Sequence, residues 1–279
     1  MPIHDQSYRR YGGGRVPRGR AWTVVMGAGL RGCFRKRAFI ALLLLSWLPF
    51  LVRAVQLYAA ANFPQMAFIA PTAETFRQFL DQQSTFVFFV TVFAGAGLVA
   101  NDRRANALQI YLSKPMTRAE YVFGKFAVLA ILLLMVTWLP AMMLLVVQMV
   151  FSGSTAFLGR NLYLVPAITL LSLIEAVMVS AAMLALSSLS RNGRFVGILY
   201  AGLIFFTDAL SGVLRVVTRD TGLAWVSFSN DLAQLGDAIF RIPLRYAMPW
   251  PVALVMVLVL VAASAAVLER RVRGVEVVS

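Results

Sequence analysis

The sequence predicts an all-α polytopic membrane protein whose chain crosses the bilayer six times. Of its 279 residues, 60% are hydrophobic and 14% are charged, and the mean hydropathy is +0.77, whereas soluble domains are roughly half apolar. Six apolar runs are each long enough to form a helix across a hydrocarbon core about 30 Å thick. No alternating pattern of about ten residues indicates a β-barrel, so the spans are expected to be helices that satisfy their own backbone groups.

The six runs are expected to form one transmembrane domain over residues 38–268. Its first run begins too far from the N-terminus and is too long for a cleaved signal peptide, so it is interpreted as a signal anchor. The predicted spans are 38–59, 84–100, 125–150, 163–189, 195–217 and 249–268.

The positive charge is distributed unevenly along the chain. The net charge is +14, which in a soluble protein would suggest nucleic acid as a partner. Here most lysines and arginines lie before the first span or follow the second, fourth and sixth spans. By the positive-inside rule, both termini and the loop 101–124 are expected to face the cytoplasm, with membrane lipids and not nucleic acid as the charge partner.

The segments that flank the spans differ in character. Residues 1–20 are rich in arginine and glycine and are interpreted as a flexible basic cytoplasmic arm. Residues 21–37 place apolar side chains at helical spacing, which favours an amphipathic interfacial helix before the first span. Residues 269–279 form a short basic cytoplasmic tail. Two longer loops on the opposite side, 60–83 and 218–248, are each expected to hold a small helix that rests on the outer surface.

The loop 101–124 carries more local structure than a connector needs. Residues 103–112 are expected to form a short helix that Lys114-Pro115 ends, because proline disfavours α geometry in the residue before it. Thr117 and Glu120 then form a capping box that begins the next helix. Residues 103–124 are thus expected to form a short helix and a rigid bend that continues into a membrane helix. This segment is either a plain connector or a docking site for a partner.

Three ionisable residues lie inside the predicted spans: Arg53, Glu175 and Asp208. A charge at mid-membrane costs several kcal/mol unless it is paired or hydrated. Counted along the helix axis, Arg53 and Asp208 lie at similar depths, which predicts an ion pair between the first and fifth spans. Glu175 either bonds to neighbouring Ser172 or Ser180, or lines a wet cavity.

Composition also excludes several chemistries. The chain has one histidine, His4, and one cysteine, Cys33, so no metal site or Cys/His catalytic pair is expected. No segment matches the phosphate-binding pattern G-x-x-x-x-G-K-[ST], so ATP hydrolysis is not expected in this chain. Two other function classes stay open: a self-contained ion-coupled carrier that uses Glu175 and Asp208, and a polytopic membrane enzyme.

The run LQIYLSKPMTRAEYVFGKF resembles the loop between the second and third spans of type-2 ATP-binding-cassette exporter permeases. The shared features are an acidic and basic start, a leucine-bearing helix, a small residue with proline, a basic residue and a final Gly-Lys. The six-span layout and the helix before the first span are also similar, whereas the frequent Gly-Thr pair of that family is Asn106-Ala107 here. The matching residues are Asp102, Arg103, Leu108, Leu112, Ser113 to Pro115, Arg118, Gly124 and Lys125.

The resemblance implies a transmembrane exporter subunit that pairs with a second copy or a close relative. A separate cytoplasmic ATPase subunit would bind the loop 101–124 as a coupling helix, and ATP and Mg would reside on that partner. The expected location is the cytoplasmic membrane of a bacterium. The residues expected to couple to the ATPase are Arg103, Arg104, Leu108, Tyr111, Leu112, Lys114, Pro115, Thr117, Glu120 and Lys125.

Overall fold

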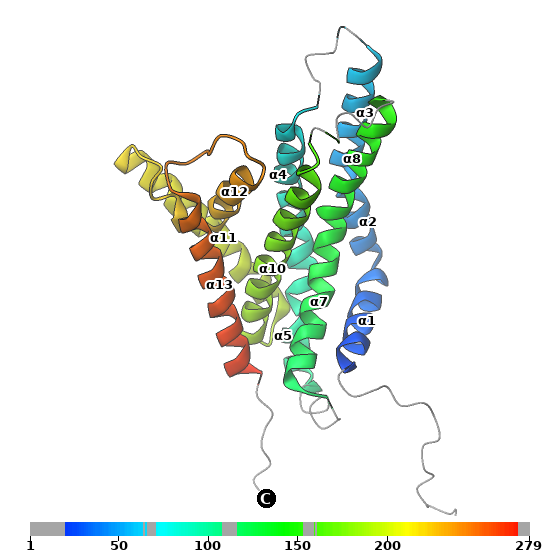
Figure 1. Cartoon of the computed structure of the whole chain (residues 1–279). Helices are drawn as coiled ribbons and strands as arrows, with labels where there is room; N and C mark the ends of the chain where they lie inside the picture. Colours follow the sequence, from blue (N-terminus) through cyan, green and yellow to red (C-terminus); the bar gives the residue numbers. More distant parts are fainter. Residues whose placement is uncertain are drawn as a thin grey trace, which may run out of the picture.

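The protein is a bundle of long helices, described by a computed structural model over residues 20–63, 65, 71–107, 116–152, 159 and 161–272 (Figure 1). Six helical segments are long and apolar enough to cross a membrane, which confirms the predicted six-span helical fold. The orientation of the termini stays a prediction. The spans are α2–α3 (Arg37–Leu45, Leu48–Asn62), α4–η2–α5 (Ala73–Val90, Thr91–Gly95, Gly97–Arg104), α7–α8 (Arg118–Val136, Trp138–Ser152), α10 (Leu164–Leu189), α11 (Gly193–Thr218) and α13 (Trp250–Arg271). Outside them lie α1 (Ala21–Phe34), the short 3-10 turn η3 (Ala224–Val226) and α12 (Phe228–Ile239).

Prolines explain why two of the spans are broken into two helices. A proline has no N–H for the carbonyl four residues earlier, and its ring clashes with that carbonyl. In the first span α2 ends at Leu45, four residues before Pro49, and in the third span α7 ends at Val136, four residues before Pro140. The chain resumes a helix at once in both cases, so each break bends the span without ending it.

The centre of the bundle is α10. In its most apolar stretch 72% of the residues are buried, compared with 22% for α11 and for α13 and 17% for α2–α3. The poorly buried spans α11, α13 and α2–α3 therefore present apolar side chains outward, as expected of helices that face lipid or another membrane protein. Figure 1 shows α1, the junction of α5 with α7, and the end of α13 at one end of the bundle; we call this the basic end, and the opposite end the α12 end.

The structure corrects the predicted bounds of two short helices. Residues 71–80 do not form a separate outer helix, because α4 begins at Ala73 and continues without a break into the second span. At the other end of this span, Arg103 and Arg104 do not begin a new helix but complete the last turn of α5. The helix ends at Arg104 with Ala105 as its C-cap, and Asn106 takes the left-handed conformation (φ 51°) that often follows a helix C-terminus.

The helix predicted within residues 218–248 is present as α12, but it does not rest on the surface. Ser227 caps it by accepting a hydrogen bond from the Asn230 backbone N–H. It lies among α4, α10, α11 and α13 at the α12 end (Figure 1). One face is fully buried and strongly polar, which a surface helix would not be. The buried face consists of Asp231, Gln234, Leu235, Gly236 and Asp237.

Candidate functional site

At the basic end, a carboxylate joins the end of the second span to the start of the third. Asp102, in the last turn of α5, accepts a hydrogen bond from the Tyr121 hydroxyl at 2.7 Å through Oδ2. The same oxygen lies 2.8 Å from Lys125 Nζ, and the lysine is nearly buried. Because a charged amine at such a position needs a partner, Asp102 and Lys125 hold α5 and α7 together on both sides of the predicted coupling loop.

The predicted capping box at the start of α7 is confirmed. Glu120 N–H donates to the Thr117 hydroxyl at 3.2 Å, and Thr117 N–H donates to Glu120 Oε2 at 2.8 Å. The other carboxylate oxygen of Glu120 accepts from the Ala21 backbone N–H at 3.3 Å. Ala21 is the first residue of α1, so one glutamate caps α7 and also supplies a partner to one of the free N–H groups at the start of α1.

The start of α5 is held by α10. Ser187 Oγ accepts from Val99 N–H at 3.1 Å and Ala100 N–H at 3.0 Å and donates to the Ala96 carbonyl at 2.8 Å. These N–H groups lie in the first turn of α5, directly after the π-helical turn η2. Arg103 also donates to the Ser188 carbonyl. The serine pair therefore fixes the second span to the central helix just before the predicted loop.

Only the ends of the predicted coupling site lie within the described residues. Arg104 is exposed at the end of α5, and Arg191 and Arg271 lie close enough to act electrostatically on Arg103. This end of the bundle is thus positively charged, as the sequence pattern predicts. The predicted contact residues Leu108, Tyr111, Leu112, Lys114 and Pro115 lie outside the described residues.

Helix α1 packs along α7 at a contact that has no room for a side chain. A Cβ added to Gly124 would lie 2.8 Å from the Trp22 carbonyl oxygen and 2.8 Å from Val25 Cβ. Both distances are shorter than real Cβ contacts, and one of the atoms is backbone. We therefore expect Gly124→Ala to push α1 away from α7 and to lower the free energy of unfolding by about 1 to 3 kcal/mol, measured by thermal unfolding in detergent.

Gly32→Ala is the matched control for this prediction. Gly32 also lies in a helix, but a Cβ there would meet no atom within 4 Å. Alanine favours the helix over glycine by about 1 kcal/mol, so this variant should be neutral or more stable. A Gly124→Ala variant as stable as Gly32→Ala would show that α1 and α7 are not in close contact.

The ion pair predicted between Arg53 and Asp208 is wrong. Arg53 donates to the glutamine carbonyls of Gln56, Gln78 and Gln82 at 3.2 to 3.5 Å. Asp208 accepts from the hydroxyls of two serines that follow its own span, Ser227 at 2.5 Å and Ser229 at 3.2 Å. The two residues lie on helices at opposite sides of the bundle, α3 and α11 (Figure 1).

Glu175 lines a cavity and does not bond to the neighbouring serines. Its side chain is near the middle of α10, and the residue is 9% exposed. The hydroxyls of Ser172 and Ser180 have no hydrogen-bond partner within the described part of the chain. Of the two alternatives that the sequence leaves open, the cavity is the one that the structure supports; its walls come from α4, α10, α11 and α12.

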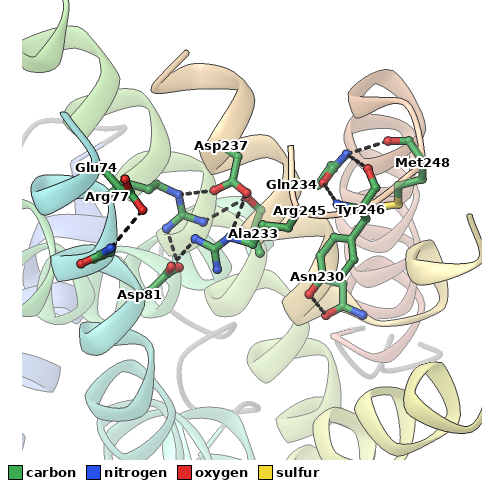
Figure 2. A network of polar contacts seen from close by, with 11 residues as sticks. Glu74, Arg77, Asp81, Asn230, Ala233, Gln234, Asp237, Arg245, Tyr246 and Met248 are labelled. Carbon is green, nitrogen blue, oxygen red and sulfur yellow. Dashed lines mark hydrogen bonds and ion pairs between the residues drawn. The ribbon is translucent and has the colours of Figure 1, made fainter. Parts of the chain in front are cut away.

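A network of four charged residues, of which Arg77 and Asp237 are buried, joins α4, α12 and the segment that precedes α13 (Figure 2). Arg77 lies 3.1 Å from Asp237 through Nε and 2.5 Å from Asp81 through Nη1, and its Nη2 donates to the Ala233 carbonyl at 3.0 Å. Arg245 lies 2.8 Å from the second oxygen of Asp237 and also pairs with Asp81. Two arginines and two carboxylates thus neutralise each other, with Asp237 fully buried.

Sequence reasoning overlooked this network, although two signals were present. Arg77 and Asp81 are spaced as a helical i, i+4 ion pair within the first half of α4. On α12, Asp231, Gln234 and Asp237 follow each other at intervals of three, so they share one face of the helix. A polar stripe of this kind in a chain so poor in charge indicates a buried polar contact.

The same helix also anchors the chain that leads into α13. Gln234 donates to the carbonyls of Tyr246 at 3.0 Å and Met248 at 2.6 Å, and it accepts from the Tyr246 N–H at 3.2 Å. The Tyr246 hydroxyl donates to Asn230 at 2.8 Å (Figure 2). Through these bonds α12 holds the segment that leads into the start of the sixth span.

Comparison with known proteins identifies the family. None of the curated proteins compared with the chain matches it. A family model described as "ABC-2 family transporter protein" matches residues 30–235, which is most of the chain and includes five of the six spans, both ends of the loop 101–124 and most of α12. The chain therefore belongs to the ABC-2 family of transporter proteins, as a membrane-spanning permease subunit.

Proposed function

We propose that this permease is the membrane-spanning half of an exporter and that a separate ATPase subunit docks on residues 101–124. ATP and Mg are bound by that partner, because the family implies an ATPase and this chain has no phosphate-binding pattern. The observation that carries the proposal is the basic-end junction: both ends of the loop are fastened to several helices by polar bonds.

The junction explains how a movement of the loop would reach the membrane helices. Asp102 and Lys125 join α5 to α7, Glu120 joins α7 to α1, and Ser187 joins α5 to the central helix α10. Interactions of this kind are short-ranged and resist being stretched, so the four elements move together. A displacement of the loop by an ATPase would thus shift α1, α5, α7 and α10 as one unit.

The proposal includes an orientation and a second subunit. The basic end faces the cytoplasm of a bacterium, where the ATPase is located, and the α12 end faces outward across the inner membrane. A second copy of the chain, or a close relative, completes the transporter. The poorly buried, apolar α2–α3, α11 and α13 provide surface for that contact as well as for lipid.

Co-purification tests the ATPase contact. We expect the tagged chain to retain a P-loop ATPase in stoichiometric amount, and the double variant Leu108→Asp/Tyr111→Asp to lose at least about nine tenths of it. A carboxylate placed in an apolar contact is desolvated without a partner, which costs several kcal/mol and thus more than a hundredfold in affinity. The measurement is the ratio of ATPase to permease after purification from native membranes.

Leu244→Asp is the control for this experiment. Leu244 is exposed at the α12 end, in the segment between α12 and α13, so its replacement should leave the ATPase bound. Loss of the ATPase from the control as well would mean that the carboxylates act by unfolding the chain. Proton-driven transport by the purified permease alone would overturn the proposal in favour of a self-contained carrier.

A further inference from the structure

A cavity of about 400 Å³ lies between α4, α10, α11 and α12. This volume is within the range of sites that hold small organic ligands. The residues that line it are mainly apolar, and several of them are aromatic. Phe88 packs against Tyr200 with ring centroids 5.8 Å apart and against Phe205 with centroids 5.6 Å apart. Phe89 and Phe228 also line the cavity.

The charges on the cavity wall are predominantly negative. Glu175, Asp208 and Asp81 are the acidic lining residues, and Arg77 is the basic one. Arg77 is already committed, because it is paired with Asp81 and Asp237. With those pairs counted as neutral, and Arg245 balancing the remaining carboxylate charge, the wall carries two uncompensated carboxylates, those of Glu175 and Asp208.

Glu175 is the group that most needs a partner. Among the described residues no hydrogen bond or ion pair reaches its carboxylate, and Arg77 and Asp81 act on it electrostatically with opposite signs. The position is near the middle of the central helix, where the ionised carboxylate costs several kcal/mol unless a cation lies beside it. Asp208, by contrast, is already bonded to two serine hydroxyls.

We propose that this cavity binds a hydrophobic cation, that is, an ammonium or phosphonium carried on an apolar, ring-sized body. Glu175 supplies the opposite charge, Asp208 adds to the negative potential, and the aromatic rings of Phe88 and Phe205 supply apolar contact and cation–π attraction. The inference that this cavity holds the transported substrate rests on the proposed exporter function. The inference that it binds such a cation does not depend on that function.

An anion of the same shape would be rejected by the same groups. It would meet two carboxylates, and it would find the nearest guanidinium, that of Arg77, already bonded to two other carboxylates. A neutral apolar molecule would fill the volume but would leave Glu175 unpaired. Sign of charge is therefore the property by which the cavity should discriminate.

Two probes of nearly equal size and shape test this discrimination: tetraphenylphosphonium, a cation, and tetraphenylborate, an anion. Binding to the purified full-length chain in neutral detergent is measured by equilibrium dialysis, without ATP or ATPase. We expect tetraphenylphosphonium to bind at least about tenfold more tightly than tetraphenylborate, and Glu175→Gln to reduce that preference about tenfold. Equal affinity for the two probes would overturn the proposal.

Control and second variants keep the test decisive. Glu74→Gln removes an exposed carboxylate at the α12 end, so it changes the net charge equally and should leave the affinity unchanged. If Glu175→Gln does not fold, Asp208→Asn and Phe205→Leu take its place, each with an expected loss of about threefold in tetraphenylphosphonium affinity. No change in either would overturn the proposal. Because neither probe needs the ATPase, failure here is separable from failure of the co-purification.

Discussion

Replacing Arg77 with methionine is expected to lower the free energy of unfolding by about 3 to 5 kcal/mol, the usual cost of removing one partner from a buried ion pair. Arg77 is 2% exposed and Asp237 is fully buried. Without the guanidinium, Asp237 keeps Arg245 as its ion-pair partner, and the Ala233 carbonyl loses the hydrogen bond from Arg77. Methionine fills a similar apolar volume, so the loss reports the charge and its hydrogen bonds more than the packing.

A double variant separates the charge effect from general disruption. In Arg77→Met/Asp237→Leu, the two most buried members leave together, and Arg245 retains Asp81 as a partner. We expect the double variant to be less destabilised than the sum of the single variants Arg77→Met and Asp237→Leu by more than about 1 kcal/mol. Unfolding in mixed detergent micelles, followed by circular dichroism, measures all three.

Arg215→Met is the control for the loss of an arginine. Arg215 is exposed near the end of α11, so its replacement should change stability by no more than about 0.5 kcal/mol. Strict additivity of the single variants Arg77→Met and Asp237→Leu would show that the two side chains do not interact in the folded protein, and the network of Figure 2 would then not be what holds α4 to α12.

Features that depend on neighbouring residues were predictable from the sequence. Hydropathy averaged over about 20 residues identifies the spans. Lipid offers no hydrogen-bond partner to the backbone, so a spanning segment must be an apolar helix that satisfies its own N–H and C=O groups. The capping box of Thr117 and Glu120 is also predictable, since the geometry of a helix N-terminus fixes both bonds within four residues. The same logic holds for the family resemblance, which depends on a short continuous run of sequence.

Lateral position was not predictable, and the Arg53 prediction failed for this reason. Counting residues along a helix gives depth, and depth alone made Arg53 and Asp208 seem partners. Which side of the bundle a helix occupies depends on contacts between segments far apart in the sequence. Arg77 and Asp237, for example, are separated by 160 residues. Nothing in the sequence around either residue indicates that the other is its partner.

Asp231 gives rise to the second large prediction, a stability that falls as the pH rises. This residue lies in the first turn of α12, it is fully buried, and neither of its carboxylate oxygens accepts a hydrogen bond from the described residues. Burial raises the pKa of Asp231 to about 8, compared with about 3.9 in an unfolded chain. The helix dipole favours the ionised form by only about 0.3 to 1 kcal/mol, too little to offset burial.

The sign of the effect follows from where the proton is bound. Between pH 4 and pH 8 the folded state keeps the Asp231 proton, whereas the unfolded state has released it. Each pH unit in this window therefore lowers the free energy of unfolding by about 1.4 kcal/mol, and above the folded pKa the loss is complete. The pKa of the Asp237 carboxyl is raised as well, by burial and against the charges of Arg77 and Arg245, so it contributes a slope of the same sign.

Asparagine isolates the contribution of Asp231, because Asp231→Asn keeps the shape of the side chain and cannot ionise. We expect the variant to equal the natural protein in stability near pH 4 and to exceed it by several kcal/mol at pH 8. Unfolding midpoints of the variant and the natural protein are measured from pH 4 to pH 9. The contribution of Asp237 is the same in both proteins, so it cancels in the difference between their pH profiles. Asp220→Asn, at an exposed carboxyl, should give no such difference. Parallel profiles for Asp231→Asn and the natural protein would mean that this carboxylate is ionised and hydrated in the folded state, and that α12 is open to water where the structure shows it closed.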